Sequence, residues 1–355
     1  MNDLPLVSII IPVYKVRDYL SRCLESLENI DYPNKEIIFV DDCCPEKSWE
    51  VCEPFLKAHP EASIIHLPEN GGVTVARMTG FERSSGEYVI FVDSDDILDS
   101  LIIRRMVAAA LASDADMVTG LYFWVYEDET KVMPFTISGV FDRTDVKRLV
   151  SSIIYYDELI RMPAIPLYIT GKLYRREVAA KSLPVGEGLI YGEDTLTVLD
   201  MLVKSVNKLV CLLDPAYYYV KREGQITGTH IYDLWPLLIK YWRRVDELGG
   251  RIFPTQLACR MWLYLSPGVF KRRENFSWWK QRKRFVQMFK SVRDIDIVKK
   301  YLWDNPKLPK LIGRHPHFIL VKRRLYLLDY ICCLLEWVIH RPYKPVKYHN
   351  PAKSD

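Results

Sequence analysis

This chain of 355 residues lacks several features that would assign it to a familiar class. Its eight cysteines include no C-x-x-C pair and no zinc-type spacing, which argues against structural zinc sites and dithiol redox motifs. No stretch of about 18 uncharged apolar residues occurs, so a membrane-spanning helix is not expected. There is no internal repeat and no low-complexity segment. The sequence opens without a signal region, so we expect reduced cysteines and a cytoplasmic location.

What the chain does contain is enough apolar material for a substantial core. Hydrophobic residues make up 49% of the sequence, and the formal net charge is only +4. This length predicts about two domains. The composition changes after the last predicted strand, so we predict one domain over residues 1–228 and a mostly helical region over residues 229–355.

The first part of the sequence alternates between apolar runs and helical patterns. A continuous apolar run predicts a central parallel strand over residues 6–13, and further strands are predicted over 36–40, 63–67 and 86–92. Helical spacing predicts helices over residues 17–30, 47–58 and 73–85. Later segments predict helices over 99–113, 145–160, 175–182 and 194–204, and strands over 116–126 and 207–221. The fold class is therefore α/β, with a mainly parallel, doubly wound sheet covered on both faces.

Residues 88–96 (YVIFVDSDD) run from an apolar strand directly into the acids Asp93, Asp95 and Asp96. The carboxyl end of such a strand faces the crevice where open α/β sheets bind ligands. Carboxylates this close repel one another, which favours a divalent cation between them. The alternative is an acidic turn that caps the following helix.

From residue 231 onward, tryptophan and tyrosine are interleaved with lysine and arginine, notably over residues 241–244, 278–284 and 317–328. Basic amphipathic helices of this kind can lie on an anionic membrane surface. They can also bind nucleic acid, or pack on the first domain and present a solvated basic face. The mixture of aromatic and basic residues favours the membrane interface.

Six motifs, taken in order, resemble glycosyltransferase family 2, which has the GT-A fold. They are VSIIIPVY (7–14), YLSRCLESL (19–27), EIIFVDD (36–42), NGG with Arg77 (70–77), FVDSDD (91–96) and GED (192–194). Each motif is weak alone, but the ordered set is specific and spans about residues 1–225. The resemblance implies a Rossmann-like GT-A domain that is an inverting, metal-dependent glycosyltransferase.

The resemblance also implies roles for individual residues. It implies that the donor nucleotide is bound by Pro12, Val13, Tyr14, Asp41, Asp42, Arg77, Asp93, Ser94 and Asp95. Asp95 and Asp96 would hold Mn²⁺ or Mg²⁺, which prefer carboxylate and phosphate oxygens. The alternatives are ordinary core packing for Tyr14 and a surface ion pair for Arg77.

Asp194 is the predicted general base, with Glu193 orienting it or holding the acceptor. The alternative is that these two acids cap the helix that follows, where carboxylates favour the helix dipole. Lys172, Arg222 and Thr227 are further candidates for contacts with phosphate or acceptor.

The expected partners are a nucleotide-sugar, in particular a UDP-sugar, and a saccharide or lipid-linked acceptor of bacterial surface polysaccharide synthesis. We expect a peripheral position at the inner membrane surface and no nucleic acid, and we leave a homo-oligomer open. One alternative function is nucleotidyl transfer, although the usual glycine-rich basic loop is missing after the first strand. The other is a non-catalytic glycan-binding scaffold on the same fold.

Overall fold

The computed structural model describes residues 4–133, 137–153, 165–221, 231–249 and 290–306, with residues 257, 258, 261, 286, 287, 319 and 323. The chain divides into two compact units. The first unit combines Met1–Val150 with Ala164–Arg222, and the second combines Ser151–Pro163 with Glu223–Asp355. The predicted boundary between residues 228 and 229 lies outside the described residues.

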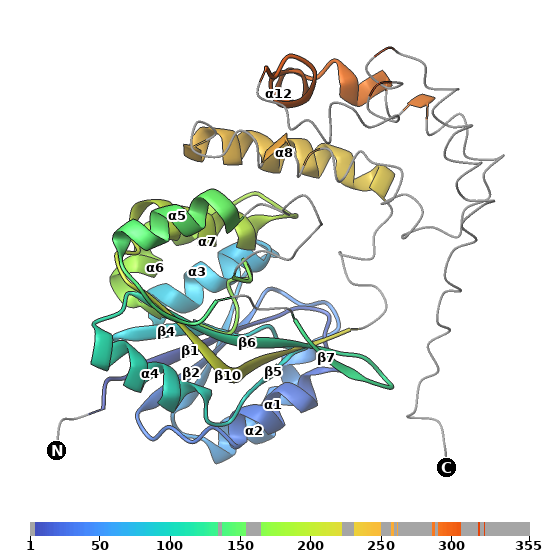
Figure 1. Ribbon diagram of the computed structural model, residues 1–355. Coiled ribbons are helices and arrows are strands. Elements are labelled where there is room, and N and C mark those ends of the chain that lie inside the picture. Colours follow the sequence, from blue (N-terminus) through green and yellow to red (C-terminus); the bar gives the residue numbers. More distant parts are fainter. Residues whose placement is uncertain are drawn as a thin grey trace. The chain divides into compact units, whose positions relative to one another are not determined.

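A mixed sheet forms the centre of the first unit (Figure 1). Its strands are β1 (Val7–Val13), β2 (Lys35–Asp41), β3 (Ala62–His66), β4 (Tyr88–Phe91), β5 (Ile97–Leu98), β6 (Met117–Val125), β7 (Thr130–Val132), β8 (Gly139–Phe141), β9 (Lys172–Arg175) and β10 (Leu209–Val220). Their order is β3-β2-β1-β4-β9-β6-β10-β5, with β7 beside β6 and β8 beside β10.

The N-terminal half of the sheet is parallel, as the sequence predicts. β1 pairs in parallel with β2 and with β4, and β2 pairs in parallel with β3. All seven residues of β1 are buried, which explains why this strand is almost wholly apolar; its one polar side chain, Ser8, donates to Glu36 at 2.7 Å. The predicted parallel arrangement is therefore confirmed over these four strands.

The other half of the sheet is mixed. β9 lies between β4 and β6 and is antiparallel to both, whereas β6 and β10 run parallel. β9 is absent from the sequence-based prediction because it is only four residues long and reads Lys-Leu-Tyr-Arg, which lacks a strand pattern. This strand brings Lys172 into the interior of the sheet.

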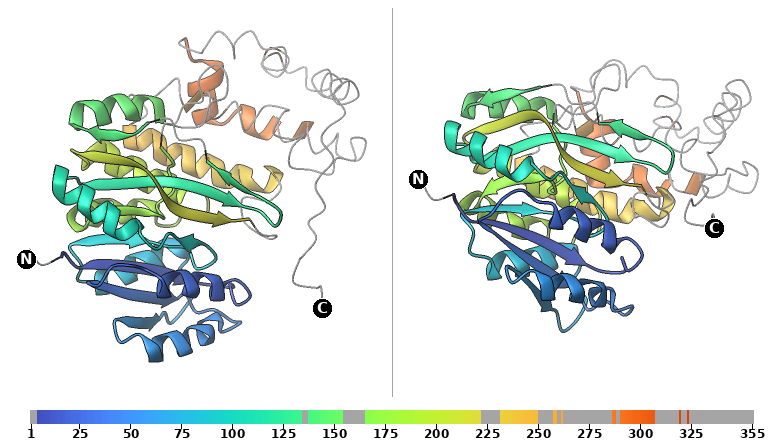
Figure 2. Two further views of the ribbon diagram at one scale, coloured as in Figure 1. Left: turned by 60° about the horizontal axis from the view of Figure 1, so that its bottom comes forward. Right: turned by 90° about the horizontal axis from the view of Figure 1, so that it is seen from below.

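Helices cover both faces of the sheet. They are α1 (Leu20–Glu28), α2 (Glu53–Ala58), α3 (Val73–Arg83), α4 (Ile102–Ser113), α5 (Arg143–Ile153), α6 (Arg176–Ser182) and α7 (Glu193–Lys204), with 3₁₀ turns at Ser48–Cys52 and Leu183–Gly186. In Figure 1, α3, α6 and α7 lie above the sheet and α1, α2 and α4 lie below it, and Figure 2 gives two further views.

Helix α3 packs very closely on the sheet, which matters for the candidate site. A Cβ atom added at Gly80 would come within 2.5 Å of Ile10 Cγ2 on β1, so only glycine allows this approach. Arg77 lies one turn earlier on the same helix and is therefore held near the ends of the strands.

In the second unit the described residues are mainly helical, with α8 (Ile231–Gly249), α12 (Asp296–Val298) and a π-helical turn at Lys299–Trp303. On α8, Tyr241 and Trp242 are buried, while Arg243 pairs with Asp296 at 2.8 Å. Here the aromatic and basic residues belong to a packed helix with a solvated face.

The other basic aromatic segments lie almost wholly outside the described residues, so the expected membrane contact stays a prediction. Among the helices that the structure describes, none has both the length and the apolar character needed to cross a bilayer.

Candidate functional site

Polar side chains from four separate segments meet at the carboxyl edge of the parallel strands. Asp41 ends β2, Asp42 follows it, and Asp93 comes just after β4. Arg77 reaches this edge from α3, and Asp194 reaches it from the first turn of α7. The edge of the sheet that the sequence singled out is therefore where these residues converge.

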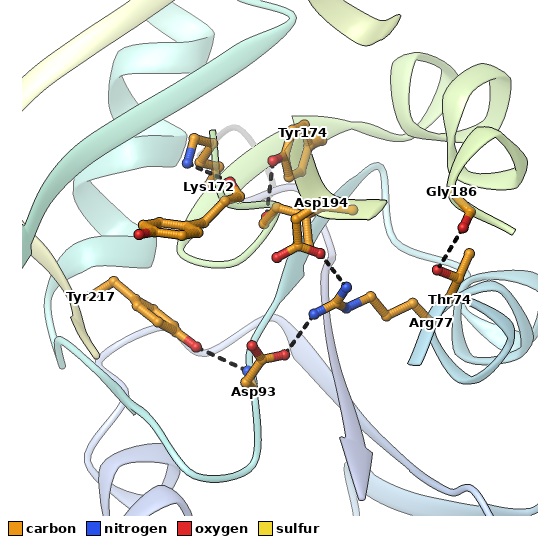
Figure 3. Close-up of polar contacts among 10 residues, drawn as sticks. Thr74, Arg77, Asp93, Lys172, Tyr174, Gly186, Asp194 and Tyr217 are labelled. Carbon is orange, nitrogen blue, oxygen red and sulfur yellow. Dashed lines mark hydrogen bonds and ion pairs between the residues drawn. The ribbon is translucent and has the colours of Figure 1, made fainter. Parts of the chain in front are cut away.

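Arg77 bridges two carboxylates and is itself almost fully buried (Figure 3). Its Nη1 lies 2.5 Å from Asp194 Oδ1, and its Nη2 lies 2.7 Å from Asp93 Oδ1. The residue is only 3% exposed, so the interpretation of Arg77 as a surface ion pair is wrong. A buried guanidinium needs such partners, because an unpaired charge in the interior is strongly destabilising.

Burial and the ion pair shift the pKa of Asp194 in opposite directions. Burial raises the pKa of Asp194, whereas the Arg77 guanidinium opposes this shift and favours the carboxylate. Burial also lowers the pKa of Arg77, but Asp194 and Asp93 outweigh it, and the net pKa of Arg77 is raised. Arg77 thus stays charged, and Asp194 is a carboxylate with an elevated pKa, which suits a general base.

A single peptide group links Asp194 to Lys172. The backbone N–H of Ile169 donates to the Asp194 carboxylate. The carbonyl of the same peptide belongs to Tyr168 and accepts a hydrogen bond from Lys172 Nζ at 2.6 Å. Lys172 is fully buried and also donates to the Tyr122 hydroxyl at 2.6 Å. The lysine polarises the peptide that holds Asp194, because hydrogen bonds in a chain strengthen one another.

Glu193 lies beside Asp194 in the first turn of α7, directly after Gly192, whose φ is +80°. Burial and the neighbouring Asp194 raise the pKa of Glu193 to about 8. Two adjacent acids at a helix N-terminus benefit from the helix dipole, so a capping effect and a chemical role are compatible here.

The acids at residues 93–96 differ in exposure and in partners. The N–H of Asp93 donates to the Tyr217 hydroxyl at 3.0 Å, Ser94 is buried and Asp95 is half-buried. Asp96 is fully buried, and its Oδ1 accepts the Val220 N–H at 2.9 Å. Its Oδ2 has no hydrogen-bond partner within the part of the chain that the structure describes.

A cation at this acidic cluster would have to take most of its ligands from a substrate. Burial, then Asp95 and Asp93, raise the pKa of Asp96 well above its ordinary value, and hydrogen bonds from the Val220 N–H and the Tyr217 hydroxyl only partly oppose this shift. Within the described ranges, no group of three or more His, Cys, Asp or Glu side chains is arranged to hold a metal. Mg²⁺ commonly needs only one or two carboxylates when phosphate oxygens complete its shell.

The two acids at the end of β2 organise the neighbouring loops. Asp42 accepts the N–H groups of Gly71 and Gly72 at 2.7 and 3.0 Å, which fixes the turn into α3. Gly72 has a φ of +84°, which favours glycine. Asp41 contacts His66 Nδ1 at 3.0 Å and accepts the Cys44 N–H at 3.0 Å. Contacts of these acids with a nucleotide stay predictions.

Three further candidates end β1 or follow it. Pro12 and Val13 are buried, and the Val13 carbonyl accepts the Asp42 N–H at 3.1 Å. Tyr14 is 38% exposed, so ordinary core packing is the wrong interpretation of this ring. The predicted Arg222 and Thr227 lie outside the described residues.

Comparison with known proteins assigns the domain. Residues 8–181 match the family model of glycosyl transferase family 2. These residues belong to that family. The fold agrees, because the structure of Staphylococcus aureus TarS residues 1–349 in complex with UDP-GlcNAc superposes with a TM-score of 0.64. That likeness covers 95% of this chain and 93% of TarS at 17% identity, and it shows the GT-A fold predicted here.

Curated relatives of the family 2 domain come from bacteria. The glycosyltransferase GlyG of Streptococcus pneumoniae serotype 4 is 33% identical over 134 residues, which cover 38% of this chain and 44% of GlyG. The uncharacterized glycosyltransferase EpsJ of Bacillus subtilis is 28% identical over 63% of each chain. This chain thus spans less than two thirds of either relative.

Sequence-based prediction missed three interaction partners in the first unit: His66, Tyr217 and Ile169. His66 lies opposite Asp41 in the register of β2 and β3, so comparing the ends of adjacent strands could have paired them. Tyr217 belongs to the aromatic run of β10, whose alternation could have indicated its face. Ile169 contacts Asp194 through its backbone N–H, and the identity of a side chain gives no information about such a contact.

We predict that Lys172→Met changes the pH dependence of stability. Burial lowers the pKa of Lys172 to about 7, whereas the unfolded chain keeps a value near 10.5. Between these pH values the unfolded chain binds more protons, so raising the pH favours the folded wild type. Its stability relative to the variant should rise by about 1 kcal/mol per pH unit. Urea unfolding across this pH window measures the difference, and a constant difference would contradict the prediction.

Proposed function

We propose that the family 2 domain transfers a sugar from a nucleotide-sugar donor, a UDP-sugar, to a saccharide or lipid-linked acceptor of bacterial surface polysaccharide. The observation that carries the proposal is the buried Arg77, which holds Asp194 next to the acidic cluster. TarS has been solved with UDP-GlcNAc and with UDP, and a further relative, GgaA of Bacillus subtilis, is named a minor teichoic acid biosynthesis protein.

In this proposal Asp194 acts as the general base of a single displacement. Its carboxylate takes the proton from an acceptor hydroxyl as that oxygen attacks the anomeric carbon. The bond between this carbon and the donor phosphate breaks, and its electron pair leaves with the nucleoside diphosphate. One displacement inverts the configuration. Arg77 and the Ile169 N–H position the base and favour its ionised form before the proton arrives.

Charge on the departing diphosphate must be stabilised. Asp95 and Asp96 would hold Mn²⁺ or Mg²⁺, which when bound supplies positive charge to the phosphate oxygens. The unpartnered Oδ2 of the buried Asp96 supports this assignment. Pro12, Val13 and Tyr14 would line the nucleotide site.

Asp194→Asn should strongly reduce transfer while leaving the fold and UDP affinity intact. The amide keeps the shape of the side chain but cannot accept the acceptor proton, so kcat should fall about 10²- to 10⁴-fold. Glu177→Gln is the matched control, because Glu177 is an exposed acid in the first turn of α6. Radiolabelled sugar transfer and UDP titration provide the measurements. Retained transfer in Asp194→Asn would rule out this base.

Removal of divalent cations with EDTA should stop donor turnover, and Mn²⁺ should restore it. In Asp95→Asn the Mn²⁺ concentration for half-maximal turnover should rise about tenfold or more, because a ligand loses its charge. Asp128→Asn, in the exposed loop between β6 and β7, is the control. Turnover that is insensitive to the chelator would contradict a metal-dependent reaction.

A further inference from the structure

A ladder of four tyrosine rings leads from the ion pair to the protein surface. Tyr217 begins the ladder, because its hydroxyl accepts the Asp93 N–H at 3.0 Å (Figure 3). Its ring centre lies 5.6 Å from that of Tyr122, which lies 6.0 Å from Tyr168. Tyr168 in turn stacks on Tyr219 with ring centres 6.2 Å apart. The first two rings are buried, whereas Tyr168 is 39% exposed.

The exposed end of the ladder is tied directly to the candidate base. Tyr168 shares a peptide group with Ile169, whose N–H donates to Asp194. The carbonyl of that peptide is held by Lys172 Nζ at 2.6 Å. Tyr168 is thus anchored through its backbone, next to the peptide N–H that favours the Asp194 carboxylate.

The position of the ladder in the sheet separates it from the predicted nucleotide side. Asp41 and Asp42 lie at the end of β2, on one side of β4 in the strand order. Tyr122 on β6, and Tyr217 and Tyr219 on β10, lie on the other side, beyond β9. Asp93, at the end of β4, stands between the two groups.

The chemistry of the two outer rings suits a sugar, because Tyr168 is exposed and Tyr219 is half-buried. Tyr168 and Tyr219 are nearly parallel, with an interplanar angle of 7°. Pyranose rings carry C–H groups on one face, which pack on aromatic rings, and hydroxyls at their edges, which need hydrogen-bond partners. Lys221 Nζ lies 4.3 Å from the centre of the Tyr219 ring and supplies a donor there.

We infer that Tyr168 and Tyr219, with Lys221 at their edge, form the subsite that binds the acceptor saccharide beside Asp194. This inference rests on the proposed function, because Asp194 has to be the base for the position to matter. The acceptor ring stacks on Tyr168, and a hydroxyl at its edge points toward the Asp194 carboxylate.

The test compares saccharide binding by ring-removing and ring-keeping variants of the full chain in the presence of UDP. The probes are the methyl glycosides of glucose, galactose, mannose and N-acetylglucosamine, followed by saturation-transfer NMR. At least one probe should bind the wild type through one ring face. Tyr168→Ala and Tyr219→Ala should each weaken that binding about tenfold, whereas Tyr168→Phe should stay within about threefold.

Tyr218→Ala is the matched control. Tyr218 is the neighbouring residue on β10, and its ring stacks on Phe123, with ring centres 5.0 Å apart, on the opposite face of the sheet. This variant loses a comparable ring contact but should bind the saccharide as the wild type does. Equal losses in Tyr218→Ala and Tyr168→Ala would mean that the effect is structural, and would overturn the subsite.

UDP titration of the same variants distinguishes failure of the proposed acceptor subsite from failure of the proposed glycosyltransferase function. Wild-type protein that binds neither UDP nor a UDP-sugar contradicts the proposed function itself. Protein that binds UDP but none of the probes, or whose Tyr168→Ala and Tyr219→Ala variants bind them unchanged, overturns the subsite alone. Unchanged UDP affinity together with lost saccharide binding in either alanine variant supports it.

Discussion

The candidate site depends on one buried cation. The guanidinium of Arg77 lies between Asp93 and Asp194, and these three residues come from α3, the end of β4 and the start of α7. Removing Arg77 would leave the buried Asp194 carboxylate without its cation, and an unpaired charge in the interior typically costs about 3–5 kcal/mol. The electrostatic need to pair this cation therefore fixes the relative positions of three distant segments.

The same network extends from β2 to the candidate base. Asp42 binds the two glycine N–H groups at the turn into α3, and Gly80 lets that helix press against β1. Arg77 is delivered by this helix to Asp194. Hydrogen bonds and helix α3 thus connect the end of β2, where nucleotide contacts are predicted, to Asp194 on α7.

Sequence patterns predicted the parallel half of the sheet because β1, β2 and β4 are largely buried and rich in apolar residues. They also predicted the acids at the carboxyl edge, since Asp42 and Asp93 follow such strands and Asp194 lies in the first turn of a helix. They failed for β9, whose buried Lys172 contradicts a strand pattern. They also failed for the partners of Arg77, because the Arg77–Asp194 pair joins residues 117 positions apart and no local spacing encodes it.

The pH profile of donor turnover in Arg77→Gln tests the central role of this cation most directly. Arg77 lowers the pKa of Asp194, so its removal should raise that pKa. The base would then be protonated at a pH where the wild type is active. The acidic limb of kcat/KM for a UDP-sugar should therefore move upward by about one pH unit or more. An acidic limb that does not move, with turnover equal to that of the wild type, would contradict the role assigned to Arg77.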